Sequence, residues 1–133
     1  MREAFDIWEE YAQVQFIETQ RPLPERLIIT FHGKRNTSDT FDGRGNVLAH
    51  AILPSGNCTR CYLHFDESED WETDDCVRLF SVGLHEIGHS LGLSHSQDRK
   101  AVMYEMYTGH MDLAYDDILS IYISQGKVGK VIL

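Results

Sequence analysis

The stretch that decides the fold is V82-G-L-H-E-I-G-H-S-L-G-L-S-H-S96, which contains three histidines and one glutamate in fifteen residues. His85 and His89 stand four positions apart, so on a helix their side chains project from one face, about one turn apart. No proline interrupts residues 74–91, and Gly92 supplies a helix stop. We therefore predict one long helix over this range.

The two helical histidines can share a metal ion, and zinc suits them because imidazole nitrogen binds Zn²⁺ at about 2.0–2.1 Å. A catalytic zinc site has three protein ligands and keeps a fourth position for water. The third ligand cannot come from the same helix face without crowding, so the chain must turn first. Gly92 permits the positive φ of such a turn, and His95 then returns to the metal.

Glu86 is rotated by about 100° from His85 on the helix, so it reaches the metal-bound water instead of the ion. Together these residues form the pattern HExxHxxGxxH, an established zinc-peptidase signature. Glu86 as general base would take a proton from that water and pass it to the leaving amine. The predicted reaction is peptide-bond hydrolysis without a covalent intermediate. A Glu86 that only forms a surface salt bridge, among ordinary histidines, is the competing interpretation.

Length and charge exclude several classes of protein. The chain has 133 residues, 42% of them hydrophobic, which suits one domain with one core. Its formal charge of −9 repels nucleic acid and anionic membrane surfaces. No apolar run approaches the ~18 residues of a membrane span, and the first residues lack a secretory hydrophobic segment. We expect no nucleic-acid partner and no membrane segment. The negative charge favours cations, including metal ions, as ligands.

Two further groups of side chains can have either an ordinary structural role or a role in metal binding. Acidic residues concentrate in D66-E-S-E-D-W-E-T-D-D75, where most side chains suit a solvated loop and a minority can chelate a metal ion. The cysteines are Cys58, Cys61 and Cys76, and one C-x-x-C falls short of a four-cysteine zinc site. Incidental loop cysteines are the favoured interpretation, and their redox state stays open.

Hydrophobic periodicity predicts two more helices. Apolar residues at helical spacing indicate an amphipathic helix over residues 2–18. We expect four of its side chains in the core: Phe5, Trp8, Ala12 and Phe16. Residues 115–123 indicate a closing helix. We expect three of its side chains to face inward: Ile118, Leu119 and Tyr122.

Short runs of β-branched and aromatic residues predict three strands, at 27–31, 47–53 and 61–65. The last alternates in a way that suggests an edge-like strand. The order of helix, strands, helix, loop and helix predicts an α+β fold, with helices packed on a small sheet.

Four stretches resemble the catalytic domain of the matrixins, the matrix metalloproteinases of the metzincin clan. They are A4-F-D-I-W8, F41-D-G-R-G-N-V-L-A-H-A51, H64-F-D-E-S-E-D-W71, and V82–S96 with A101-V-M-Y-E-M-Y107. Ser96 directly after His95 fits matrixins, whereas astacins typically place Glu there and reprolysins Asp. Met103, eight residues after His95, matches the Met-turn methionine beneath the zinc. An ordinary core methionine is the alternative.

The resemblance covers nearly the whole chain and implies one metzincin-like catalytic domain over residues 1–133. Its expected architecture is a small, twisted, mostly parallel sheet with three helices. Its expected activity is that of a zinc-dependent metalloendopeptidase acting on extracellular-matrix or other secreted proteins, with Glu86 as the general base. The resemblance further implies a secreted, monomeric protein, whose partners are protein or peptide substrates and protein protease inhibitors.

The resemblance also implies a structural calcium site built from hard oxygen ligands on two loops. The matching positions are the Asp42 side chain, the carbonyls of Gly43, Gly45 and Val47, and the carboxylates of Asp66 and Glu69. A plain turn beside an acidic surface loop is the alternative.

A second, structural zinc site of the family matches His50 and His64. The other two ligands usually come from an HGD segment, but K34-R-N-T-S-D-T40 is one residue shorter and contains no histidine. Asp39 and His32 lie nearby in the sequence without occupying the matching positions. Two histidines that cover a strand edge are the alternative.

For substrate binding, the resemblance places Ser81, Val82 and Tyr107 around S1′, the pocket for the residue after the cut bond. A side chain as small as that of Ser81 favours a deep S1′ pocket. Glu105 replaces the usual proline after the Met-turn tyrosine, and its charge could disfavour acidic substrate residues.

The chain departs from the family at its start. Matrixin catalytic domains begin with a strand before the AFxxW helix, whereas Met1 heads that helix here, so we expect an N-terminally truncated domain without this strand. We also expect no cysteine-switch propeptide and no hemopexin domain. Two other interpretations stay open: a catalytically weak or inactive metal-binding fragment or isoform with a regulatory or binding role, and a metal-buffering or adhesion module, against which the intact Glu86 argues.

Overall fold

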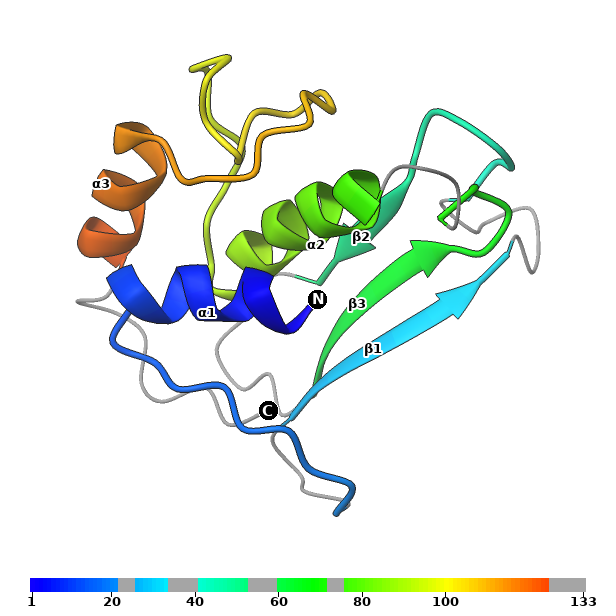
Figure 1. The fold of residues 1–133 in the computed structure, drawn as a ribbon, viewed down its shortest axis with the longest axis horizontal. Helices are drawn as coiled ribbons and strands as arrows, with labels where there is room; N and C mark the ends of the chain where they lie inside the picture. The colour runs from blue at the N-terminus through cyan, green and yellow to red at the C-terminus, as the bar shows by residue number, and fades with distance from the viewer. Residues whose placement is uncertain (22–25, 34–40, 53–59, 72–75, 125–133) are drawn as a thin grey trace.

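The computed structural model describes residues 1–21, 26–33, 41–52, 60–71 and 76–124, and Figure 1 shows how their helices and strands are arranged. The elements are α1 (Arg2–Tyr11), β1 (Arg26–His32), β2 (Ala49–Ala51), β3 (Arg60–Asp66), α2 (Cys76–Ser90) and α3 (Tyr115–Ser124). The expected α+β fold, with three helices on a small sheet, is confirmed within this part of the chain.

The described strands form a sheet of order β1-β3-β2. β1 runs parallel to β3 over seven paired positions, from Arg26 opposite Arg60 to His32 opposite Asp66. β2 runs antiparallel to β3 over three positions. The sheet is therefore mixed and most of its pairing is parallel, as expected.

β3 is the central strand, so the prediction of an edge-like strand at 61–65 is wrong. Cys61, Leu63 and Phe65 are buried, while Tyr62 and His64 on the opposite face are half-buried. This alternation reflects which face of the sheet is covered, and it carries no information about a strand's neighbours. Cys61 accordingly lies within a strand and is not a loop cysteine, whereas Cys58 falls outside the described residues.

α1 is shorter than the predicted 2–18 helix, because Ala12 already has an extended backbone with φ −95° and ψ 143°. The four predicted core residues of this segment are nevertheless buried. Along a continuous helix, Phe5 and Phe16 would be about 16 Å apart at 1.5 Å per residue, but their ring centroids lie 4.7 Å apart. The chain therefore doubles back, and Arg2 fixes it by donating to the Phe16 carbonyl at 2.8 Å.

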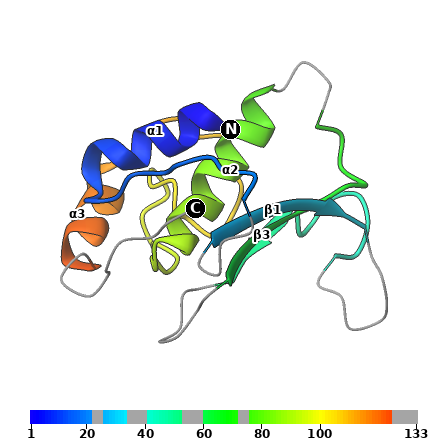
Figure 2. The same cartoon turned by 90° about the horizontal axis from the view of Figure 1, so that it is seen from below.

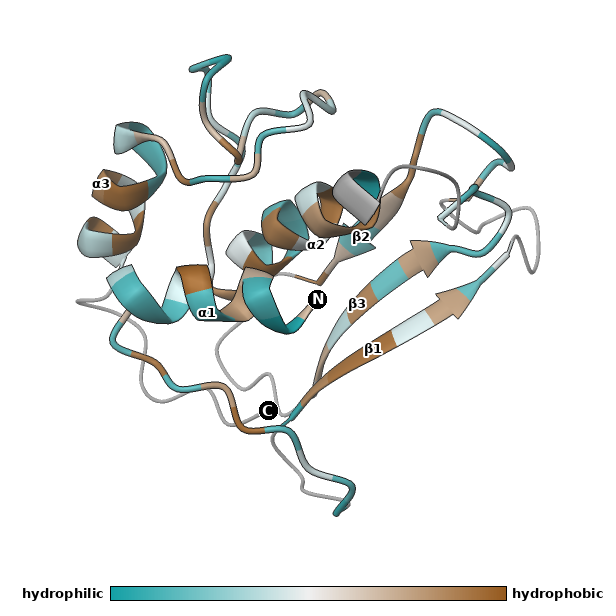
Figure 3. Cartoon of the chain, viewed as in Figure 1, coloured by the Kyte–Doolittle hydropathy of each residue, from teal (hydrophilic) through white to brown (hydrophobic). Residues whose placement is uncertain are grey.

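α1 and α2 lie on the same side of the sheet, as Figure 2 shows. The Trp8 indole N–H joins the two helices by donating to the Leu84 carbonyl at 2.8 Å. Hydrophobic residues recur along both helices and along the strands (Figure 3). The large side chains that are almost completely buried include Trp8, Leu63, Phe65, Leu84, Ile87, Leu91 and Met103. None of the described helices is long and apolar enough to cross a membrane.

α3 presents a different face to the core from the one predicted. Leu119 and Tyr122 are exposed, Ile118 is half-buried, and Asp117 and Ile121 are buried instead. The cause is polar: the Asp117 carboxylate accepts backbone hydrogen bonds from the neighbouring loop, and this turns its side of the helix inward. Residue hydrophobicity alone therefore misled the prediction of this helix face.

Candidate metal centre and active site

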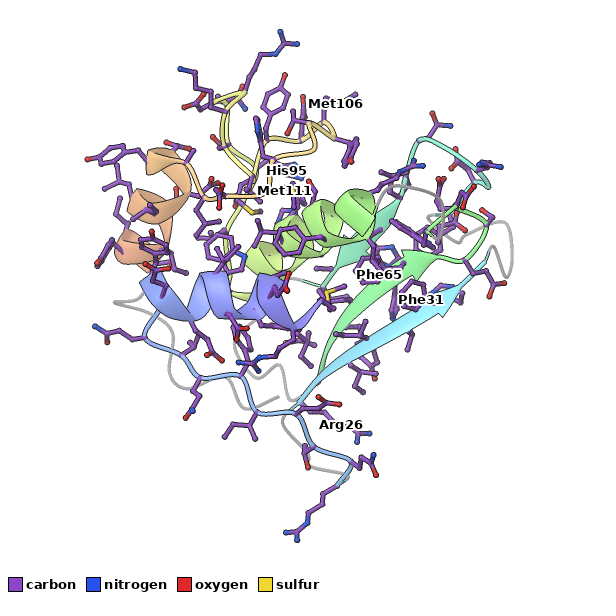
Figure 4. All side chains as sticks on the ribbon, in the orientation of Figure 1. Arg26, Phe31, Phe65, His95, Met106 and Met111 are labelled. Carbon is purple, nitrogen blue, oxygen red and sulfur yellow. The ribbon has the colours of Figure 1, made fainter. Side chains whose placement is uncertain are left out.

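His85 and His89 lie on α2, and His95 lies on the loop above that helix, where Figure 4 labels it. Their ligand atoms all lie within 4.8 Å of one another. The Nε2 atoms of His89 and His95 are 3.1 Å apart. Among the described residues, this is the only group of three or more histidine, cysteine or acidic side chains gathered closely enough to hold a metal ion.

The return of His95 depends on the predicted turn. Gly92 has φ +92°, and its N–H donates to the His89 carbonyl at 2.8 Å. The next N–H, of Leu93, donates to the Gly88 carbonyl at 3.1 Å. These bonds satisfy the carbonyls at the end of α2 while the left-handed residue redirects the chain.

The orientations of two imidazole rings are set by backbone carbonyls. The Nδ1–H of His85 donates to Val102 O at 2.7 Å, and that of His89 donates to Leu93 O at 2.7 Å. Each bond directs the Nε2 atom of its ring to the common centre, as at zinc sites whose outer hydrogen bonds fix the tautomer. Burial lowers the pKa of His85 from 6.5 to about 4 and also lowers the pKa of His89. Both rings are therefore neutral at pH 7, the form that binds a metal ion.

Glu86 is buried beside these ligands, and its Oε2 atom has no hydrogen-bond partner among the described residues. Burial raises the pKa of its carboxyl from 4.5 to about 8. A surface salt bridge is thus not the state of this side chain. A buried carboxyl group with an unpaired oxygen beside three convergent imidazoles fits a zinc ion with a bound water.

A cavity of about 640 Å³ opens over this centre. Its lining includes the three histidines and Glu86, the segment Asn46–Ala51 with β2, and the segment Tyr104–Thr108. The three residues predicted to form the S1′ pocket, Ser81, Val82 and Tyr107, all line it. The cavity therefore brings together the three histidines, a strand at the edge of the described sheet and the residues predicted to form S1′.

Met103 is buried next to α2, and a Cβ added at Gly88 would overlap its sulfur. Its N–H donates to Asp117 Oδ1 at 3.0 Å, and its carbonyl accepts the N–H of Ser96 at 2.7 Å. The methionine thus lies close behind the histidine-bearing face of α2, as the Met-turn resemblance requires. Gly88 supplies the space for it, so this glycine packs against Met103 and Trp8.

Sequence reasoning missed Asp117, which supports this loop. Its carboxylate accepts the N–H groups of Val102 at 2.8 Å, Met103 at 3.0 Å and Ala114 at 2.8 Å. The only sequence signal was the pair of acidic residues at the start of the closing helix, which is ordinary for a helix N-terminus.

The two loops predicted to bind calcium lie together. The Gly45 N–H donates to Glu69 Oε1, and the Asp66 N–H donates to the Leu48 carbonyl at 2.9 Å. Asp66 Oδ1 accepts two bonds from Ser68, while its buried Oδ2 has no hydrogen-bond partner among the described residues. An orphaned carboxylate oxygen of this kind suits a cation. Asp66 and Glu69 are buried, so they do not belong to a solvated loop.

Four predicted calcium ligands lie on the first of these loops. Gly43 and Gly45 have φ +102° and +90°, which bends the backbone here. Asp42 is exposed and accepts a hydrogen bond from Asn46 Nδ2 at 2.9 Å. Val47 is exposed and lines the cavity.

His50 and His64 are brought together across β2 and β3, with His50 Nε2 3.0 Å from His64 Nδ1. The His32 ring lies 4.8 Å from the His64 ring, centroid to centroid, although Nδ1 of His32 contacts its neighbour's carbonyl. Asp39 lies outside the described residues.

Comparison with known proteins agrees with this geometry. The family model described as Matrixin matches residues 1–123. Human matrix metalloproteinase-19 is 40% identical, with 99% of this chain and 26% of the relative covered. The macrophage metalloelastase of Oryctolagus cuniculus is 37% identical, with 91% of this chain and 27% of the relative covered. The interstitial collagenase of Sus scrofa is 37% identical, with 95% of this chain and 27% of the relative covered.

The chain thus spans about a quarter of the length of these relatives. The match over residues 1–123 nevertheless includes the three convergent histidines, Glu86 and Met103. The chain therefore belongs to the matrixins, a family of zinc metalloendopeptidases.

Proposed function

We propose that this chain is a zinc-dependent endopeptidase, in which His85, His89 and His95 hold the metal and Glu86 is the general base. The observation that carries the proposal is the unpaired, buried Glu86 carboxylate at the floor of the cavity where the three imidazoles converge. A zinc ion bound there supplies a Lewis acid that activates water and polarises a peptide carbonyl. Glu86 accepts the proton of the attacking water and delivers it to the leaving amine.

The substrate binds as an extended peptide beside β2. This strand pairs with β3 on one side and lines the cavity, so its other edge offers backbone groups to an incoming peptide. The side chain after the cut bond enters the pocket of Ser81, Val82 and Tyr107. Because Ser81 is small and Val82 and Tyr107 offer apolar surface, this pocket favours a hydrophobic side chain.

We further propose a structural calcium ion at Asp66 and Glu69, with Asp42 and the carbonyls of Gly43, Gly45 and Val47, and a second zinc at His50 and His64. The unpartnered Asp66 Oδ2 supports the first site. The contact of two histidine nitrogens at 3.0 Å supports the second.

The natural setting that we propose follows from the relatives, two of which are named for collagen-cleaving and elastin-cleaving activity. The chain acts as a monomer outside the cell on extracellular-matrix or other secreted proteins. Protein inhibitors of peptidases occupy the same cavity.

The test uses purified chain with zinc and calcium and a library of quenched fluorogenic peptides. We expect cleavage before hydrophobic residues, blocked by a chelator and by a hydroxamate. Glu86→Ala keeps its zinc and loses about 10²–10⁴-fold in kcat/KM, the usual contribution of a general base. Glu10→Ala, an exposed position on α1, is the matched control and keeps full activity. A folded, zinc-loaded wild type that cuts no peptide would overturn the proposal and favour the inactive metal-binding fragment.

A further inference from the structure

Arg78 occupies a place that connects the acidic loop to the substrate pocket. It lies near the start of α2, four residues before Val82 and seven before His85, so the three share one helix face. At 1.5 Å per residue, Arg78 is about 10 Å from His85 along the helix axis. Val82 and His85 line the cavity, and Arg78 lies one turn beyond Val82 on the same helix face.

Its guanidinium makes an ion pair with a buried carboxylate. Arg78 Nη2 lies 3.0 Å from Glu69 Oε2, and the Glu69 side chain has no exposed surface while that of Arg78 is 25% exposed. A carboxylate removed from water needs a positive partner, and losing this partner leaves an uncompensated buried charge. Arg78 is therefore held in place by Glu69.

The same guanidinium faces two aromatic rings. Its central carbon lies 6.0 Å from the ring centroid of Tyr107 and 6.0 Å from that of Trp71. A planar guanidinium can stack on an aromatic face and keep an ion pair at its edge, which a lysine ammonium does less well. Tyr107 is a wall residue of the cavity, and it belongs to a loop outside the described helices and strands.

We propose that Arg78 is a positioning residue for the substrate pocket: it ties the Tyr107 wall to the buried Glu69 carboxylate and thereby fixes how deep the pocket is. Its effect on substrate choice rests on the proposed peptidase function. Its effect on the Tyr107 ring does not, so the two are measured separately.

The experiment compares Arg78→Met with Arg44→Met in the zinc- and calcium-loaded chain. Arg44 is the matched control because it also pairs with the acidic loop, to Asp70 Oδ2 at 3.3 Å, but its side chain is mostly exposed. Because Arg78→Met alone leaves the Glu69 carboxylate without its guanidinium partner, the double variant Glu69→Gln/Arg78→Met removes both charges and keeps an oxygen that accepts the Gly45 N–H. Glu69 is also a proposed calcium ligand, so Glu69→Gln is the reference for the double variant, and only the difference between the two is assigned to Arg78.

The first readout is the NMR spectrum of the chain with ¹³C-labelled tyrosine rings, which needs no turnover. We expect the Tyr107 ring signals to move and broaden in Arg78→Met and in the double variant, and to stay in place in Arg44→Met. Unchanged Tyr107 signals in the folded double variant overturn the proposal.

The second readout is the dissociation constant of two peptide hydroxamates that differ only in a methyl or a long aromatic group at the S1′ position. We expect the double variant to lose about tenfold of its preference for the long group, the scale of selectivity that pocket shape supplies. Its affinity for the methyl compound equals that of Glu69→Gln. An unchanged preference overturns the proposal, whereas a wild type that binds selectively but cuts no peptide overturns only the peptidase function.

Discussion

The Nδ1–H of His85 donates to the carbonyl oxygen of Val102 at 2.7 Å, so the backbone after the histidine motif orients a metal ligand. That backbone is itself held by Asp117, which accepts the Val102 N–H at 2.8 Å and the Met103 N–H at 3.0 Å. A continuous set of hydrogen bonds thus runs from α3 to the metal centre. Outer hydrogen bonds of this kind govern metal affinity because they fix the ligand ring.

We therefore expect Asp117→Asn to weaken zinc binding by about 10–100-fold, the usual effect of losing such a partner. The amide keeps one accepting oxygen, and its NH₂ group faces backbone N–H donors, so the Val102 segment moves away from His85. The measurement is competition for zinc with a chromophoric chelator.

Ile121→Ala is the control for this prediction, since Ile121 is buried on the same face of α3 and bonds to no part of the Val102 segment. It should lower the unfolding free energy by about 2–5 kcal/mol and leave zinc affinity unchanged well below its melting temperature. Equal losses of affinity in both variants would show that Asp117 acts only through general stability.

Gly88 and Gly83 give opposite predictions on one helix. A Cβ at Gly88 would overlap the Met103 sulfur and lie 2.9 Å from the Trp8 ring, both within the core. We expect Gly88→Ala to destabilise the fold by about 1–3 kcal/mol through overpacking. At Gly83 the added atom overlaps only the flexible end of Met1, at 2.8 Å, and makes an ordinary contact with the Phe65 ring at 3.9 Å. Because alanine favours helix by about 1 kcal/mol over glycine, Gly83→Ala should be neutral or stabilising. Thermal melts of the two variants decide this, and equal melting temperatures would contradict it.

The convergence of the three histidines was predictable because the pattern that determines it is local. Helical geometry alone predicts how His85, Glu86 and His89 lie relative to one another. Gly92 indicates the turn that brings His95 back to them. The end of α1 was not predictable in the same way. Phe16 continues the helical spacing of its stripe, but it reaches the core by folding back onto Phe5, a tertiary contact that no local pattern reveals.

The misplacement of β3 and of the α3 face has a similar cause. Strand alternation identifies a covered face and leaves strand order undetermined, so Cys61–Phe65 gave no sign of its central place. On α3, Leu119 and Tyr122 are more apolar than Asp117. Asp117 is nevertheless buried, because three backbone N–H groups donate hydrogen bonds to its carboxylate. A buried polar residue with its own partners overrides a hydrophobic pattern.

The pKa of Glu86 predicts how the stability of the metal-free chain depends on pH. Burial raises this pKa from 4.5 to about 8, so the folded state holds the proton more tightly than the unfolded state. The resulting stabilisation is present at low pH and is lost as pH rises through 8. Glu86→Gln cannot titrate at this position. As the pH rises from 4.5 to about 8, the unfolding free energy of this variant should therefore increase relative to that of wild type, by at most about 1.4 kcal/mol per pH unit. Urea unfolding with a chelator at pH 5 to 8 measures this, and a constant difference would contradict it.

Calcium should raise the melting temperature through Asp66. A ligand present at 100 times its dissociation constant stabilises the folded state by about 2.7 kcal/mol, which corresponds to roughly 8–16 °C for a domain of this size. Asp66→Asn keeps an oxygen for Ser68 but removes the charge, so the shift should vanish. Asp112→Asn, at an exposed position, should keep the shift. No calcium effect on wild type would remove the support for this site.

The number of zinc ions per chain separates the two histidine clusters. With His50 Nε2 and His64 Nδ1 3.0 Å apart, we expect two zinc ions in wild type, one at each cluster. His50→Ala and His89→Ala should each bind a single zinc, because each removes a ligand from a different cluster. Only the His50 variant should still cleave peptide, since its three-histidine centre and Glu86 are intact. Elemental analysis beside a cleavage assay tests this pair, and a wild type that holds one zinc would assign His50 and His64 to covering the strand edge.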